Sequence, residues 1–183
     1  MGDPKKQKNK YQSPSHPWQR ARLEKEAVLR KEYGLHRKNE IWKMQSLLRK
    51  FKQQAKKLIA RTDAQSKIEQ TQLISRLYKL GLIEKESSRE KILDIDERAI
   101  FERRLQTLVF KLGLARSITQ ARQLIVHGHI LVNDKKVSVP SYIVRRDEEN
   151  KIKFDPASSF NNIEHPERKI LQKTEKPKVE VKA

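Results

Sequence analysis

The chain has 183 residues, with 42 Lys and Arg against 23 Asp and Glu, no Cys, and a formal net charge of +19. The lack of Cys excludes disulfides, thiolate nucleophiles and cysteine zinc sites, and no stretch approaches the roughly 20 apolar residues that span a bilayer. A positive excess of this size opposes compaction unless a polyanion neutralises it, which favours an intracellular nucleic-acid-binding protein.

The charge is uneven along the chain. Residues 1–60 carry a net +12, residues 61–101 are neutral and residues 102–153 carry +6. Together with the sequence patterns below, this distribution predicts four parts. They are a basic extended arm (1–17), a helical RNA-binding and scaffold region (18–101), a small α+β domain (102–157) and a C-terminal tail that is disordered when free (158–183).

The arm combines four lysines with three prolines, so it cannot bury enough surface to fold alone. A solvated tail is the alternative, but lysines gain from phosphate contact. We therefore expect the arm to lie on RNA.

Three helices are predicted in the next region. The first lies between Trp18 and Gly34, and the second runs from about Asn39 to Ala60 with apolar residues at steps of three and four. The remaining positions of the second helix are mostly Lys and Arg with almost no acids, which favours RNA contact over a merely solvated face. The third spans about 64–80, has Ile68 in its apolar stripe, and ends at Gly81.

Residues 92–100 are predicted to start another helix. They contain the closest approach to a carboxylate cluster in the chain, Asp94, Asp96 and Glu97. Such a cluster can serve acid–base or metal chemistry. Because no other ligand accompanies it, we interpret these residues as helix N-terminal acids stabilised by the macrodipole.

Residues 102–154 predict a complete small α+β fold. A helix containing Leu105 and Leu112 ends at Gly113, and Ser117 caps a second helix that ends at Gly128. After Gly128 the period of the apolar residues changes from that of a helix to two, which is typical of β-strands. We predict strands at 129–132, 137–139, 142–144 and 151–154, with turns at 133–136 and 147–150. Basic residues at the ends of these elements could converge on one edge and form a groove for folded RNA.

The string RRLQTLVFKLGLARSITQARQLIVHGHILVNDKKVSVPSYIV resembles the RNA-binding domain named after the fourth small-subunit ribosomal protein. Outside it, MGDPKK, His-Pro-Trp at 16–18 and YGLHRKNEIW at 33–42 resemble archaeal members of that ribosomal protein family. The resemblance covers nearly all of residues 1–160.

The resemblance implies a structural constituent of the cytoplasmic small ribosomal subunit. Such a protein binds small-subunit ribosomal RNA directly and early in assembly, at a helix junction in the 5′ domain. It also contacts neighbouring ribosomal proteins near the messenger entry channel and influences decoding fidelity. No enzyme activity, cofactor, metal, small-molecule substrate or membrane is expected. Some bacterial relatives carry a cysteine zinc site, which a chain without Cys does not share.

Two other functions remain open from the residues alone. The first is an RNA-modifying enzyme, because the same small domain occurs in pseudouridine synthases and some synthetases. Residues 1–101, however, contain no catalytic constellation. A DNA regulator could use the helix pair, although Arg122 is the single strongly basic residue on its second helix. His127 and His129 could bind a metal, could stack on RNA, or could be structural; we favour stacking.

We expect residues 1–60 to supply most of the affinity and the small domain to set the position on the RNA. Reversing Arg104 and Arg122 should then weaken binding with little change in thermal midpoint. The predicted rRNA-binding residues are Lys5, Lys6, Lys8, Lys10, Arg37, Lys38, Lys43, Arg49, Lys50, Lys56, Lys57, Arg103, Arg104, Arg116, Ser117, Thr119, Arg122, Gln123, His127, His129, Asn133, Lys135 and Lys136.

Overall fold

The computed structural model describes residues 2, 9–61, 63–85, 90–162 and 165–166. The chain divides into two compact units. The first, here called the helical unit, comprises Met1–Tyr78 and Leu82–Phe101. The second, here called the C-terminal module, comprises Lys79–Gly81 and Glu102–Ala183. Each unit is described by itself below.

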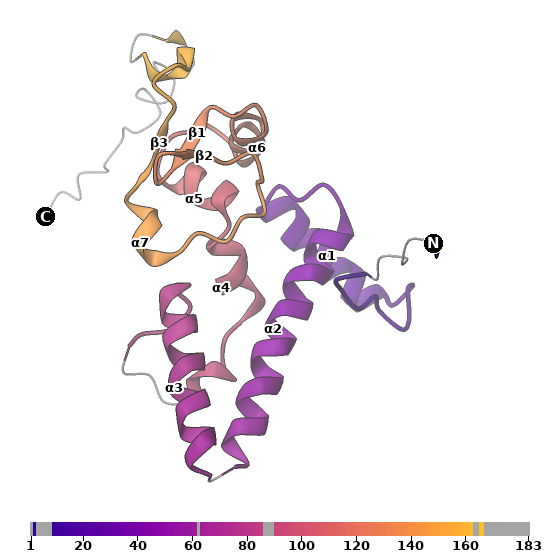
Figure 1. The fold of residues 1–183 in the computed structure, drawn as a ribbon. Helices are drawn as coiled ribbons and strands as arrows, with labels where there is room; N and C mark the ends of the chain where they lie inside the picture. Colours follow the sequence, from indigo (N-terminus) through magenta and orange to yellow (C-terminus); the bar gives the residue numbers. More distant parts are fainter. Residues whose placement is uncertain (1, 3–8, 62, 86–89, 163–164, 167–183) are drawn as a thin grey trace, which may run out of the picture. The chain divides into compact units, whose positions relative to one another are not determined.

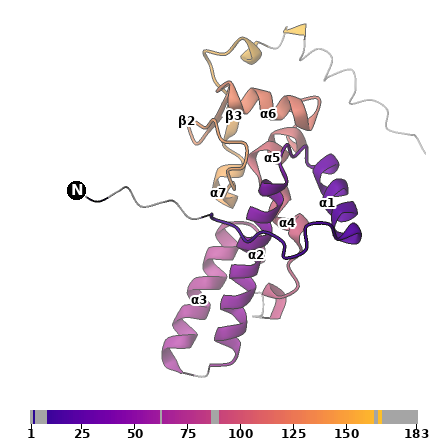
Figure 2. The same ribbon diagram turned by 90° about the vertical axis from the view of Figure 1, so that its right-hand side faces the viewer.

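The helical unit is organised around one long helix. It contains α1 (Arg20–Glu32), α2 (Lys38–Ile59), α3 (Ala64–Lys79), a 3₁₀ turn (Glu90–Ile92) and the start of α4 (Glu97–Glu102). Helices α2 and α3 run side by side in both views (Figures 1 and 2). The buried apolar residues of α2 repeat every three or four positions, as an amphipathic helix requires, and the buried hydroxyl of Ser46 lies among them. The buried residues of this helix are Ile41, Met44, Ser46, Leu48, Phe51, Ala55 and Leu58.

A buried carboxylate links the segment directly before α1 to the first two helices. Glu26 is 2% exposed and accepts hydrogen bonds from Arg22 Nη1 at 2.6 Å and from Trp42 Nε1 at 3.0 Å. Arg22 Nη2 also donates to the carbonyl oxygens of His16 and Pro17. Because a buried charge needs partners, this network fixes the approach of the preceding residues to α1.

The end of the predicted arm is held against α2. The backbone N–H of Gln12 donates to Ser46 Oγ at 3.0 Å, and the rings of Tyr11 and Trp42 lie 5.8 Å apart. Composition predicts that residues 1–17 cannot bury enough surface to fold alone. In the described part of the arm, Tyr11 and Gln12 instead pack against residues of α2.

The predicted continuous helix from residue 92 is wrong. After the 3₁₀ turn the chain breaks, and α4 begins only at Glu97. Both Ile92 and Ile95 are buried, and the intervening non-helical backbone brings the two side chains into the core. Ile68, assigned to the buried stripe of the third helix, is 54% exposed.

The C-terminal module is α+β, as predicted. It contains α5 (Leu105–Lys111), α6 (Ile118–Val126), β1 (Ile130–Val132), β2 (Lys135–Lys136), α7 (Arg146–Glu149), β3 (Ile152–Phe154) and a 3₁₀ turn (Ser159–Asn161). The three strands form an antiparallel sheet in the order β2-β1-β3 (Figure 1). Leu131 pairs with Lys136 on one side and with Lys153 on the other.

The core of the module joins both helices to the sheet. Its buried members are Leu105, Leu108, Val109, Ala115, Ala121, Leu124, Ile125, Ile130, Val132, Val144, Ile152 and Phe154. The predicted cap of the second helix is confirmed, because Ser117 Oγ accepts from the backbone N–H of Gln120. The predicted helix-ending glycines have positive φ, at Gly34, Gly81, Gly113 and Gly128.

Four predicted details of the sheet and its turns are wrong. The turn after β1 is two residues long, because Asn133 and Asp134 both adopt positive φ, 52° and 61°, as a tight hairpin turn requires. The return strand is therefore Lys135–Lys136, not 137–139. Ile143 forms an isolated bridge to Arg104 instead of a sheet strand, and the expected turn at 147–150 is mostly α7.

Candidate RNA interface

A pocket of about 480 Å³ lies along α6 in the C-terminal module. Six of the residues predicted from the sequence line it, and these are Arg116, Ser117, Thr119, Gln123, His127 and His129. The helix places them together because they occupy its N-terminal turn, one exposed face and the segment that leads to β1. Gln120, Leu124 and Phe160 complete the lining.

The start of α6 presents a cation and hydroxyl groups beside a helix N-terminus. Arg116 and Thr119 are exposed, and the backbone N–H of Arg116 donates to Gln120 Oε1 at 2.7 Å. A helix N-terminus with a neighbouring Arg favours anions such as phosphate. This end of the pocket is therefore suited to the RNA backbone.

The other end of the pocket is aromatic. His127 and His129 have ring centroids 6.4 Å apart, and Phe160 lies 5.0 Å from His129. His129 Nδ1 is 2.9 Å from Ser158 Oγ, which orients the ring. Rings of this kind stack on unpaired bases. Among the described residues no group of three or more side chains that could hold a metal ion occurs.

Sequence reasoning missed Phe160 because it assigned residues from 158 onward to the tail. The ring packs against the core of the module and stacks on Phe154, with centroids 6.4 Å apart. The ring of His165 lies 4.6 Å from it in a tilted arrangement. The available signal was a large aromatic residue six positions after the end of the last strand, in a segment that could fold back.

Two predicted cations lie inside the module instead of on its surface. Arg104 is 1% exposed, so its predicted position at the edge of a groove is wrong. The side chain of Arg103 is 13% exposed and forms an ion pair with Glu149 at 2.7 Å and a hydrogen bond to the carbonyl of Val144. Arg103 also packs against Gly81, where a Cβ would lie 2.9 Å from its Cζ. Arg122 is half-buried.

The hairpin cations are partly neutralised within the module. Lys136 Nζ lies 2.7 Å from Asp155, and this hydrogen bond holds the pKa of the Asp155 carboxyl below its ordinary value. Lys153 of β3 lowers the pKa of Asp134, in the hairpin turn, in the same way, and their atoms lie 2.6 Å apart. Lys135 is exposed, while Asn133 accepts from Lys151.

The cations of α2 differ, because they face solvent. The exposed ones are Arg37, Lys38, Lys43, Arg49, Lys50, Lys56 and Lys57. Arg49 hydrogen-bonds Gln12. In the part of the chain that the structure describes, none of these seven forms an ion pair with an acid, which leaves their charge available to a polyanion. Lys10 is also exposed, whereas Lys5, Lys6 and Lys8 lie outside the described residues.

Comparison with known proteins identifies the C-terminal module by sequence. The S4 domain family matches residues 103–150. The chain is 50% identical over 167 residues to the small ribosomal subunit protein uS4 of Sulfurisphaera tokodaii, covering 91% of this chain and 93% of that protein. It is 49% identical to the same-named protein of Sulfolobus acidocaldarius, covering 87% and 92%, and 48% identical to that of Saccharolobus islandicus, covering 88% and 90%. No helix in the described ranges is long and apolar enough to cross a membrane.

Proposed function

The chain belongs to the family of small ribosomal subunit protein uS4, and on that premise we propose that it binds small-subunit ribosomal RNA directly through two separate surfaces. One surface is the α6 pocket of the C-terminal module. The other is the row of exposed cations on α2. The protein is a structural, RNA-binding component of the cytoplasmic small ribosomal subunit and takes part in translation; it is not an enzyme.

The observation that carries the proposal is the composition of the α6 pocket. It joins a helix N-terminus and Arg116, which suit phosphate, to the rings of His127 and Phe160, which suit a base. A protein that binds a regular duplex needs no such aromatic rings, because the bases of a duplex remain stacked on one another. The pocket therefore favours folded RNA with unpaired nucleotides over duplex DNA.

The test is a footprint of the full chain on naked small-subunit rRNA at moderate salt, with duplex DNA as competitor. We expect protection of a helix junction in the 5′ domain that persists under excess DNA. The variant Arg116→Glu should lose this protection, while Arg145→Glu, an equal charge change at an exposed residue outside the pocket, should retain it. Equal competition by duplex DNA would overturn the proposal.

Two finer roles follow from family membership and are part of the proposal. Binding to naked rRNA without other ribosomal proteins would place the chain early in assembly. A position near the messenger entry channel, beside neighbouring ribosomal proteins, would link it to decoding fidelity. The check is reconstitution with and without the chain, followed by a misreading assay. Unchanged assembly order and unchanged misreading would remove both roles while leaving rRNA binding intact.

A further inference from the structure

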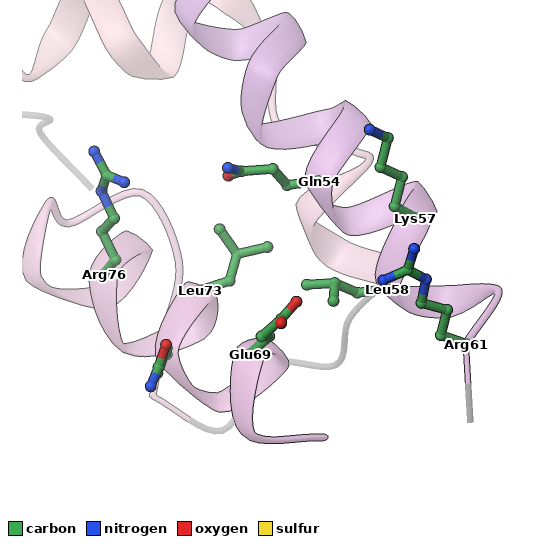
Figure 3. Close-up of a pocket in the computed structure, with 8 residues that line it drawn as sticks. Gln54, Lys57, Leu58, Arg61, Glu69, Leu73 and Arg76 are labelled. Carbon is green, nitrogen blue, oxygen red and sulfur yellow. The ribbon is translucent and has the colours of Figure 1, made fainter. Parts of the chain in front are cut away.

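A second pocket lies between α2 and α3 in the helical unit, and its volume is about 340 Å³ (Figure 3). Leu58 from α2 and Leu73 from α3 form its apolar floor, and each is 7% exposed. Polar and charged residues surround this floor, and these are Gln54, Lys57, Arg61, Glu69, Gln72 and Arg76. Of these, the sequence analysis had singled out Lys57 alone.

The walls of this pocket are held in place. Gln70 Nε2 of α3 donates to the carbonyl of Leu58 at 2.8 Å, which ties the two helices together next to the floor. Ser66 Oγ donates to the carbonyl of Asp63 at 2.7 Å and so stabilises the start of α3. At the other end, the guanidinium of Arg76 lies 5.6 Å from the ring centroid of Phe51. A ligand therefore meets a largely preformed site.

The charge in the pocket is unbalanced, because three cations face one carboxylate. In the described ranges, neither Lys57 nor Arg61 forms an ion pair. Figure 3 shows Glu69 extending from α3 toward Leu58 of α2. Glu69 accepts a long hydrogen bond of 3.3 Å from Gln65, so its carboxylate keeps acceptor capacity for a ligand.

We propose that this pocket binds one unpaired nucleotide of the RNA, a deepening that rests on the proposed rRNA binding. The base lies on the floor of Leu58 and Leu73, and the flanking phosphates contact Lys57, Arg61 and Arg76. Glu69 accepts hydrogen bonds from an amino group on the base edge. Guanine, cytosine and adenine carry such a group, whereas uracil offers only its N3–H, so the site favours a base with an exocyclic amino group over uracil.

Substitution of Glu69 distinguishes two explanations, because they predict opposite changes in RNA affinity. If the pocket is only a cationic surface, Glu69→Gln removes a repulsive charge and tightens RNA binding. If Glu69 reads a base, the same change loses a charge-assisted hydrogen bond and weakens binding by about tenfold. Glu24→Gln is the matched control, because it raises the net charge equally on an exposed part of α1.

The measurement is filter binding of the full chain to transcribed small-subunit rRNA. The double variant Arg61→Glu, Arg76→Glu should weaken binding by more than about tenfold. Lys67→Glu, Lys25→Glu is the control with the same charge change at exposed positions outside the pocket. Thermal midpoints of all variants should match that of the wild type. A photo-crosslinker at Gln72 should map to an unpaired nucleotide other than uridine.

Each alternative outcome is informative. Tighter binding by Glu69→Gln, equal to that of Glu24→Gln, would overturn the base-reading site. If the Arg61→Glu, Arg76→Glu double variant binds naked rRNA normally but enters reconstituted subunits poorly, the pocket holds a neighbouring protein and the nucleotide proposal is wrong. If the wild type fails to prefer rRNA over duplex DNA, the proposed function itself fails, whatever the pocket variants do.

Discussion

The helical unit and the C-terminal module use their positive charge in different ways. The exposed lysines of α2 have no acidic partner among the described residues, whereas Lys136, Lys153 and Arg103 of the module are paired with carboxylates of their own unit. The module instead gathers a single exposed Arg, hydroxyl and amide groups and aromatic rings in one pocket. A count of basic residues therefore overstates the electrostatic part of the module's binding. We expect the affinity that α2 supplies to depend strongly on salt, and the positioning by α6, which uses one exposed Arg, to depend on salt much less.

The largest expected effect is on the stability of the module, and it distinguishes a buried cation, Arg104, from an exposed one, Arg116. Arg104→Glu puts a carboxylate where an Arg is 1% exposed, and we expect a loss of about 3–5 kcal/mol of unfolding free energy. This replaces the expectation that the thermal midpoint would hardly change. Urea unfolding followed by circular dichroism measures the loss, with Arg116→Glu as the exposed control. Equal midpoints for the two variants would mean that Arg104 is accessible.

The second effect is electrostatic and lies on α2. Reversal of Lys43, Lys50 and Lys56 to Glu should lower rRNA affinity about a hundredfold and reduce the slope of log affinity against log salt by about three, because fewer counterions are released. Filter binding at several salt concentrations gives both values. Reversal of Lys25, Lys67 and Lys85, which are also exposed, is the matched control. The same loss in both triple variants would show that only net charge matters.

A smaller and qualitatively different effect is expected on α6. The double variant Gln123→Ala, His127→Ala removes an amide and a ring from the pocket without removing a cation, so rRNA affinity should fall about tenfold with an unchanged salt slope. Val126→Ala, an exposed residue of the same helix outside the pocket, should bind normally. A changed slope in the double variant would contradict the proposed contrast between the two units.

The smallest effect concerns the ion pair of the hairpin. The hydrogen bond from Lys136 holds the pKa of Asp155 below its ordinary value of 3.8. The stability from this pair is therefore complete above that value and is lost as the pH falls through the lowered folded-state pKa. The urea midpoint of Asp155→Asn should lie below that of the wild type at neutral pH and converge with it in acid. A constant difference between the two proteins at every pH would exclude this pair as the cause.

Local signals in the sequence predicted most helices of the fold. The apolar stripe of α2, the Ser117 cap and the glycines that end four helices each depend on residues within one or two turns. The predicted hairpin turn is two residues too long, because the sequence pattern does not reveal that Asn133 and Asp134 both adopt the left-handed backbone conformation.

Long-range partners explain the errors in the candidate site. Arg103 and Arg104 look like surface cations in sequence, because Glu149, the partner of Arg103, lies 46 positions away. Phe160 was missed for the same reason, since its place beside His129 depends on a return of the chain after β3. Charge and periodicity report what a residue is, whereas burial depends on which distant segment covers it.

The buried Glu26 network has a consequence for the kinetics of assembly. Through Arg22 it fixes residues 16 and 17 against α1, so the lysines of the first ten residues are tethered by a short length of chain to the cationic face of α2. If α2 and the arm both bind RNA, as proposed, the arm searches for phosphates within one molecule once α2 is bound, at an effective concentration on the order of millimolar. The buried carboxylate would then link two weak RNA contacts into a single, slowly dissociating attachment.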